Sequence, residues 1–235
     1  MAGERILIVD DTPVNLKLTH VLLSRHEFET ETAASAEEAL ERMAVRLPDL
    51  VIADIQLPGM DGLELTRRIK NDPAMTSVAV VALSALASPE DRRRAEAAGC
   101  DGYITKPIDT RALPGDLRTI LERRAAPGVA RREPAAAAPR PLPDMDELRL
   151  RFLRDGADAI GRFQAEFDGD FPADEACGAA HQWVGAAGLL GLPELSRLAR
   201  VLENLLRRKP VDNDELQAAL DALEREFANP TRRAG

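Results

Sequence analysis

Five polar residues in the first half of the chain follow short apolar runs, and their types suit phosphoryl chemistry. Asp10 and Asp11 follow ILIV, and Asp54 follows LVIA. Ser84 ends VAVVALS, and Lys106 follows GYIT. Three carboxylates brought together repel one another unless a cation lies among them. An incomplete, all-oxygen ligand set of this kind favours Mg²⁺.

The chemistry that such a set supports is formation of an aspartyl phosphate. Asp54 can attack a phosphoryl group, with Mg²⁺ on Asp11 and Asp54 and with Asp10 acting directly or through water. Lys106 and the Ser84 hydroxyl would contact phosphoryl oxygens. The alternative makes Asp10 and Asp11 a helix cap and Lys106 a surface lysine. The occurrence of all five at the ends of predicted strands favours the site.

The elements that must position these residues alternate along the chain. Short, β-branched apolar runs separate stretches of helical pattern, which is typical of a parallel sheet covered on both faces. The carboxyl ends of its strands share one edge, so the five residues should meet there. We expect an α/β fold with a five-stranded, doubly wound parallel sheet (flavodoxin-like), having strands at 6–9, 29–34, 50–53, 78–83 and 103–105 and helices at 13–25, 35–46, 61–70, 89–98 and 109–124.

Residues 4–124 resemble a response-regulator receiver domain of the CheY-like family. The resemblance rests on ILIVDDTPVNL, VIADIQLPGMDGLEL, ALSA and GYITKP. It implies that Asp54 is the phosphoacceptor and that Asp10, Asp11 and the backbone carbonyl of Gln56 serve the metal. It also implies a cis peptide after Lys106. Tyr103 matches the family's switch aromatic, although a half-buried strand tyrosine is the alternative.

The second half of the chain has a different pattern. We expect the receiver domain to span 1–124, and residues 125–143 are rich in Pro and Ala, which is typical of a semi-extended linker. From 144 to 230 the apolar period is helical throughout. Four helices are expected, and a four-helix bundle is the economical packing. The stripes that predict three of them are Leu148, Phe152, Ile160, Phe163 and Phe167; then Leu195, Leu198, Leu202 and Leu205; then Leu216, Leu220, Leu223 and Phe227.

His181 lies in the glycine-rich stretch GAAHQWVGAAGLLGL. Gly178, Gly185 and Gly188 share its side of a helical wheel, whereas Trp183 lies on the opposite side. Each helical glycine costs about 1 kcal/mol relative to alanine. We therefore expect an exposed imidazole on a bare face that another protein can approach. Close helix packing through small residues, with the histidine a bystander, is the alternative.

The segment AHQWVGAAGLLG resembles the signature of histidine-containing phosphotransfer (Hpt) domains. Gly185 lies at the matching offset from His181, and Leu202-Glu203 resembles a pair in that family's next helix. The resemblance implies that His181 is a phosphoacceptor. One departure is Val184, because the family usually has a lysine there that helps balance phosphoryl charge.

The net charge and the overall composition of the chain exclude several classes of function. The net charge is −9 and the pI about 5.0, which argues against a basic nucleic-acid-binding face. No apolar run approaches the length of a membrane span. Cys100 and Cys177 lie in different segments, so reduced thiols and a cytoplasmic location are expected. No ATP-binding glycine-rich loop is seen, and we expect a signalling protein rather than an enzyme.

The sequence thus predicts a two-component phosphorelay protein with Mg²⁺ as its cofactor. Asp54 would accept a phosphoryl group from a sensor histidine kinase. His181 would exchange one with a receiver domain or another phosphotransfer protein. The alternative is a phosphorylation-switched binding module whose helical bundle is a non-transferring docking or dimerisation domain, and a homodimer is left open. Neither reading includes nucleic acid or a membrane.

Overall fold

The computed structural model describes residues 3–84, 88–124, 145–167, 171–208 and 211–230. The chain divides into two compact units, Met1–Leu142 and Pro143–Gly235, which are described separately below. The predicted linker at 125–143 lies outside the described residues. Among the helices that the structure describes, none is long and apolar enough to cross a membrane.

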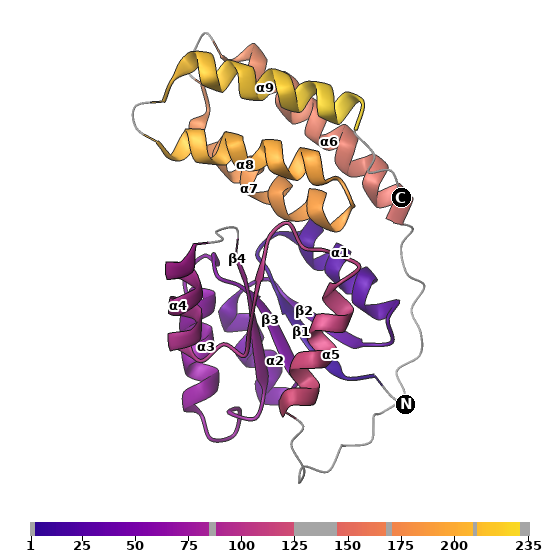
Figure 1. Ribbon diagram of the computed structural model, residues 1–235, viewed down its shortest axis with the longest axis vertical. Helices are drawn as coiled ribbons and strands as arrows, with labels where there is room; N and C mark the ends of the chain where they lie inside the picture. Colours follow the sequence, from indigo (N-terminus) through magenta and orange to yellow (C-terminus); the bar gives the residue numbers. More distant parts are fainter. Residues whose placement is uncertain (1–2, 85–87, 125–144, 168–170, 209–210, 231–235) are drawn as a thin grey trace. The chain divides into compact units, whose positions relative to one another are not determined.

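The first unit is built on a parallel sheet of five strands in the order β2-β1-β3-β4-β5 (Figure 1). This confirms the predicted doubly wound fold. The order places β1 and β3 side by side, so the residues that follow them emerge next to one another. The strands are β1 (Arg5–Val9), β2 (Glu29–Ala33), β3 (Leu50–Asp54), β4 (Ala79–Ser84) and β5 (Gly102–Thr105).

Helices cover both faces of the sheet (Figure 1). Apolar side chains of α2 and α3 pack with those of β1 and β3 in one core cluster. Several helix N-termini are capped, with the side chains of Ser35, Asp61 and Ser88 each accepting a backbone N–H. The helices are α1 (Pro13–Ser24), α2 (Ala36–Val45), α3 (Gly62–Asn71), α4 (Pro89–Ala98) and α5 (Leu113–Arg124).

The start of α5 differs from the expectation, since this helix begins at Leu113 and not at residue 109. Asp109 explains the difference. Its Oδ1 accepts the backbone N–H groups of Arg111 (2.9 Å) and Ala112 (3.2 Å), and this local turn competes with helix.

The other end of α5 is fastened to the sheet by Arg124. Its guanidinium donates to the backbone carbonyls of Thr76, Ser77 and Val78 at 3.3, 3.2 and 2.6 Å. Its Nε also lies 3.2 Å from Asp101 Oδ1. These carbonyls directly precede β4, so α5 ends at the amino-terminal edge of the sheet.

The second unit is a bundle of four helices, which confirms the predicted all-α architecture: α6 (Met145–Ala165), α7 (Ala173–Leu189), α8 (Pro193–Arg207) and α9 (Asn213–Ala228). Pro193 occupies the first turn of α8, and Asp212 caps α9. Phe167 is an exception to the predicted stripe. It lies beyond the end of α6, and its ring packs on Phe171 at a centroid distance of 6.0 Å.

Aromatic rings fill much of the bundle core. Trp183 of α7 lies 5.0 Å from Phe227 of α9 and 6.4 Å from Phe163 of α6, measured between ring centroids. Phe227 also contacts Phe152 of α6, at 5.8 Å. Gly156 makes room for Phe227, because a Cβ at that position would lie 2.1 Å from the Phe227 ring. This close approach joins α6 to α9.

Candidate functional site

The structure brings the predicted acidic residues and lysine together at the carboxyl edge of the sheet. Lys106, after β5, places its Nζ 2.5 Å from Asp54 Oδ2 and 3.1 Å from Asp10 Oδ2. Asp10 follows β1 and Asp54 ends β3, and these are adjacent strands. All three side chains are almost fully buried. Residues far apart in the sequence therefore form one charged cluster because three strands end at the same rim.

The carboxylates of Asp10, Asp11 and Asp54 are also placed to hold a cation. One oxygen from each lies within 4.8 Å of the others, with Asp10 and Asp54 buried and Asp11 exposed. Purely oxygen donors that stay open on one side fit a small, hard divalent ion that keeps some of its waters. The donor set of this acidic triad therefore fits Mg²⁺.

Two residues that the sequence analysis did not name hold Asp10 in place. The backbone N–H of Thr12 donates to Asp10 Oδ1 at 2.9 Å. The side-chain amide of Asn15 donates to both carboxylate oxygens, at 3.1 and 3.2 Å. The signal was present in the sequence, because an aspartate just before a helix commonly accepts the backbone N–H of residue i+2. These contacts orient Asp10 toward the centre of the cluster.

Burial and charge act in opposite directions on Asp54. Burial raises the pKa of Asp54 above its ordinary value, and this effect exceeds the lowering by the neighbouring Lys106 ammonium; Asp10 adds a further increase. The backbone N–H of Gln56 donates to Asp54 Oδ1 at 3.0 Å, which stabilises the ionised form. The role of the Gln56 carbonyl as a metal ligand stays a prediction.

Burial and charge also oppose each other at Lys106, and there the effect of charge on the pKa is the larger. Burial alone would lower the pKa of its ammonium group, but the carboxylates of Asp54 and Asp10 raise it above its ordinary value. Lys106 is therefore charged at neutral pH. The peptide bond between Lys106 and Pro107 is cis, as expected.

Ser84 and Tyr103 lie on the two strands beside the acidic cluster. Ser84 is buried at the end of β4, where its backbone carbonyl accepts the N–H of Lys106 at 2.7 Å. Tyr103, on β5, is half-buried and packs against a cluster that includes Ala82 and Ala95. This position fits both readings of Tyr103, so its role as a switch stays a prediction.

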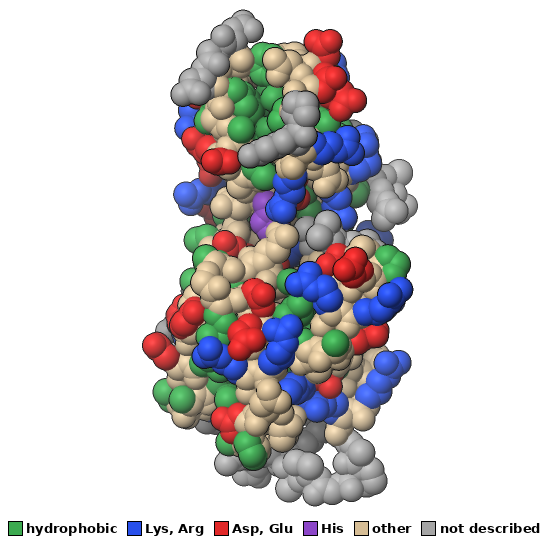
Figure 2. Space-filling view, turned by 90° about the vertical axis from the view of Figure 1, so that its left-hand side faces the viewer, with side chains coloured by type: hydrophobic (Ala, Val, Ile, Leu, Met, Phe, Trp, Pro, Cys, Tyr) green, Lys and Arg blue, Asp and Glu red, His purple; other side chains and the backbone are tan. Residues whose placement is uncertain are grey.

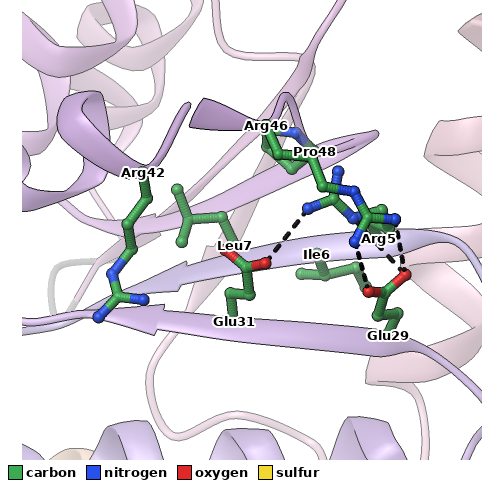
Figure 3. Close-up of a pocket in the computed structure, with 8 residues that line it drawn as sticks. All are labelled: Arg5, Ile6, Leu7, Glu29, Glu31, Arg42, Arg46 and Pro48. Carbon is green, nitrogen blue, oxygen red and sulfur yellow. Dashed lines mark hydrogen bonds and ion pairs between the residues drawn. The ribbon is translucent and has the colours of Figure 1, made fainter. Parts of the chain in front are cut away.

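A second charged cluster lies at the opposite, amino-terminal end of the strands (Figure 3). Arg5 lies 3.5 Å from Glu29 and 3.2 Å from Glu31, and Arg46 contacts Glu29 at 2.9 Å. The acids here are paired with arginines, whereas at the other rim Asp10 and Asp54 are paired with Lys106. This cluster ties β1, β2 and the end of α2 together and is a structural feature of the sheet.

His181 lies on α7 and contacts the neighbouring helix. Its Nδ1 is 2.9 Å from Glu203 Oε1 on α8. The same oxygen accepts a hydrogen bond from Arg207 Nη2 at 2.6 Å. The imidazole therefore lies along the α7–α8 side of the bundle, and its side chain is only 16% exposed, which corrects the expectation of an exposed imidazole. Sequence reasoning had noted Glu203 only as part of a family pair.

The small residues around His181 allow α7 and α8 to approach each other closely. The Ser196 hydroxyl of α8 donates to the backbone carbonyl of Val184 at 2.7 Å. Gly178, one turn before the histidine, is exposed, and a Cβ there would have no neighbour within 4 Å. Close packing against α8 and an exposed position without a side chain are therefore both found on α7, but at different residues.

On the face shown in Figure 2, acidic and basic side chains of the described residues are interspersed over both units. No extended basic face of the kind that nucleic-acid binding requires is seen in that view among the described residues.

Comparisons with known proteins agree with the two-unit architecture. A family model described as the response regulator receiver domain matches residues 6–118, and one described as the Hpt domain matches residues 147–229. The polar-differentiation response regulator DivK of Brucella ovis is 37% identical over 115 residues, which cover 49% of this chain and 91% of DivK.

Other relatives match over a smaller share of their own length. The gliding motility regulatory protein of Myxococcus xanthus is 40% identical over 102 residues, covering 43% of this chain and 13% of that protein. This chain spans 26% of the response regulator PleD of Caulobacter vibrioides. Among solved structures, the signal receiver domain of a signal transduction histidine kinase from Syntrophus aciditrophicus is 31% identical, with a TM-score of 0.50 and coverage of 58% of this chain and 99% of that chain.

The two matched segments coincide with the sheet that carries the acidic triad and with the bundle that carries His181. Both are signalling domains and not classical enzymes. The chain therefore belongs to the response regulator receiver family through residues 6–118 and carries an Hpt domain in residues 147–229, the domains of two-component phosphorelay signalling.

Proposed function

We propose that this chain receives a phosphoryl group at Asp54 from a sensor histidine kinase and exchanges one at His181 with a receiver domain. The receiver domain would span 1–124, the linker 125–143 and the Hpt domain 144–230. The observation that carries the proposal is the contact of buried Lys106 with Asp54 and Asp10, next to a third carboxylate at the rim.

At Asp54 the reaction is transfer from a phosphohistidine to a carboxylate. A carboxylate oxygen of Asp54 attacks phosphorus and forms the new P–O bond, while the P–N bond breaks. The electron pair of the broken P–N bond returns to the kinase imidazole, which recovers a neutral nitrogen. Asp10, Asp11, Asp54 and the Gln56 carbonyl would hold Mg²⁺, which supplies charge neutralisation at the phosphoryl oxygens when bound.

The other residues of the rim stabilise the product. Lys106 would release its contact with Asp54 Oδ2 and pair with a phosphoryl oxygen, and the Ser84 hydroxyl would donate to another. Tyr103 is proposed to report this change by moving with Ser84. No residue far from the rim is needed for these steps.

At His181 the imidazole acts as a nucleophile without a metal of its own. Among the described residues, the acidic triad of the receiver is the single group of three or more possible metal ligands. A partner receiver would therefore supply Mg²⁺ and a lysine when it docks on α7. The kinase and that receiver are partners of known class and unknown identity, and a cytoplasmic location is part of the proposal.

A second function is favoured by one observation, the valine at position 184. Without the lysine usual in Hpt domains, the bundle could be a docking or dimerisation unit governed by Asp54. In that case the receiver would accept a phosphoryl group, and His181 would not.

The test is to label the full chain and compare the chemistry of the label in two variants. Acetyl phosphate with Mg²⁺ should give an acyl phosphate that is lost in base and is absent from Asp54→Asn. Phosphoramidate should give a phosphohistidine that is lost in acid and is absent from His181→Gln. Matched controls are the exposed residues Asp116 and His26, changed to Asn and Gln, which should label normally.

The outcomes separate the two functions. Base-labile label alone supports the docking unit and contradicts phosphotransfer at His181. Label that persists in both variants, or no label on the wild-type chain, contradicts the proposed function as a whole.

A further inference from the structure

Asn15 contacts both oxygens of the Asp10 carboxylate from the first turn of α1. Its side-chain Nδ2 lies 3.1 Å from Asp10 Oδ1 and 3.2 Å from Asp10 Oδ2. Both side chains are almost fully buried. Only the NH₂ end of an amide can donate to an ionised carboxylate, so this contact determines which way the amide of Asn15 points. A single neutral group therefore holds the Asp10 carboxylate by both of its oxygens.

The contact of Asp10 with Asn15 differs in kind from its contact with Lys106. Lys106 Nζ lies 3.1 Å from Asp10 Oδ2 and also contacts Asp54. Its ammonium group is charged, so it competes with a metal ion for the oxygens of both carboxylates. The amide of Asn15 carries no net charge. It orients Asp10 without neutralising it, and the negative charge of Asp10 stays available to a cation.

The first turn of α1 has a composition that fits this role. A helix N-terminus favours acidic residues because of the positive end of the helix dipole, and the first turns of α2, α3, α4 and α5 each contain one. The first turn of α1 contains none. Asn15 is the third residue of this helix, where a carboxylate of the same shape would lie within hydrogen-bond distance of Asp10. An amide avoids that repulsion and supplies a donor instead.

The same amide also presents a buried acceptor beside the acidic cluster. In the part of the chain that the structure describes, no donor reaches Asn15 Oδ1, although this atom is buried. Leaving a buried acceptor without a donor is costly, and a water molecule commonly supplies the missing hydrogen bond. Mg²⁺ in proteins usually keeps several of its waters. An ion held by Asp10, Asp11 and Asp54 would bring such donors to this rim.

We propose that Asn15 is a positioning residue that sets the affinity of the receiver for Mg²⁺. Its Nδ2 holds the Asp10 carboxylate in place for the ion, and it continues to do so when Lys106 turns to a phosphoryl oxygen. Its Oδ1 accepts a hydrogen bond from a water molecule that the ion carries. This inference rests on the magnesium site of the proposed function and extends it to a residue outside the ligand set.

The first part of the test measures Mg²⁺ binding to the full chain by calorimetric titration, without any phosphoryl donor. Asn15→Leu has nearly the same shape and cannot donate. It should bind Mg²⁺ about tenfold more weakly than wild type, the lower end of the range for residues that orient metal ligands. Asn15→Ala, which cannot overpack the site, should show the same loss. Thr19→Val is the matched control, because Thr19 is an equally buried polar residue one turn later on α1.

The second part separates positioning from a general loss of structure. Labelling of Asp54 by acetyl phosphate is followed at increasing Mg²⁺ concentration, and circular dichroism checks that each variant is folded. Asn15→Leu should need about tenfold more Mg²⁺ for half-maximal labelling, the same factor as its loss of affinity. Saturating Mg²⁺ should restore most of the wild-type rate. A crystal structure of the wild-type chain with Mg²⁺ should show a water molecule of the ion within hydrogen-bond distance of Asn15 Oδ1.

Each outcome decides a defined part of the proposal. Mg²⁺ binding by the two Asn15 variants that is as tight as in Thr19→Val overturns the positioning role, and so does a loss of rate that saturating Mg²⁺ leaves in place. A bound ion with no water on Oδ1 overturns the role of that atom. If wild type binds Mg²⁺ but takes no label, the proposed phosphoacceptor function fails, while the titration still decides the role of Asn15. A wild-type chain that binds no Mg²⁺ overturns the inference itself.

Discussion

Asp54 is a carboxylate that the fold buries beside another carboxylate, and this placement favours reactivity over stability. Burial and Asp10 both raise its pKa, and Lys106 compensates only in part. Removing one partner of a buried ion pair destabilises a protein when it leaves the other charge unpaired, but without the Asp54 charge Lys106 keeps Asp10 as its counter-ion. The ionised carboxylate of Asp54 therefore destabilises the folded receiver, and a bound cation can reduce this destabilisation.

The sign of this cost gives a prediction for Asp54→Asn. A folded pKa above the ordinary value of 3.8 means that the folded state holds the proton more tightly. This contribution stabilises the fold below that value and is lost as the pH rises through the folded pKa. At pH 7 without divalent ions, Asp54→Asn should be more stable than wild type by about 1–2 kcal/mol.

Urea denaturation at pH 7, with and without Mg²⁺, measures this difference in the free energy of unfolding. Added Mg²⁺ should stabilise the wild type more than the variant and so close the gap, and lowering the pH toward 4 should also reduce it. A variant that is less stable than wild type in the absence of Mg²⁺ would show that the electrostatic argument is wrong.

At the scale of elements, the contact between α6 and α9 depends on the absence of a side chain. Gly156 receives the ring of Phe227, which also contacts Trp183 and Phe152. Two opposing effects meet at this position. Alanine is the better helix former by about 1 kcal/mol, whereas overpacking a filled core costs typically 1–3 kcal/mol.

We expect overpacking to exceed the helix propensity in Gly156→Ala, because a Cβ would lie 2.1 Å from the ring. The bundle should lose about 1–2 kcal/mol of unfolding free energy. Gly161→Ala on the same helix is the matched control, since nothing lies within 4 Å of its Cβ, and it should gain up to about 1 kcal/mol. Denaturation followed by Trp183 fluorescence compares them, and equal stabilities would contradict the packing argument.

At the scale of the whole molecule, each unit has its own core. Each unit also carries one feature that an experiment can follow separately. The acidic triad belongs to the first unit, and the single tryptophan belongs to the second. A ligand that binds only a folded unit stabilises that unit by an amount set by its concentration relative to its dissociation constant. Mg²⁺ should therefore act on one unit alone.

We predict that Mg²⁺ at ten times its dissociation constant raises the unfolding free energy of the receiver by about 1.4 kcal/mol. The midpoint that Trp183 reports should stay unchanged. Circular dichroism reads the receiver and the bundle together, whereas fluorescence reads the bundle. An equal shift in both signals would mean that the two units unfold as one.

The sequence predicted the elements well and the contacts between distant residues less completely. Strand order and the meeting of Asp10, Asp54 and Lys106 follow from the parallel topology, which fixes where strand ends lie. The start of α5 was misplaced, because the local turn at Asp109 competes with helix propensity.

The surroundings of His181 were the least predictable part of the site. A helical wheel describes one helix, and it cannot show which neighbouring helix approaches or in what register. The contact of His181 with Glu203 depends on how α7 packs against α8, and the shared oxygen with Arg207 depends on that packing in turn. The spacing of Arg200, Glu203 and Arg207 was the signal that could have drawn attention to α8.

The backbone contacts of Arg124 fix the place on the sheet at which the chain that follows α5 begins. Its anchor precedes β4, whereas Asp54 lies at the far rim, about 20 Å away along the strands. A tether the length of residues 125–143 reaches at most about 65 Å when fully extended. If His181 exchanges a phosphoryl group as proposed, the length of this tether sets how strongly the receiver of the same chain competes with the receivers of other molecules.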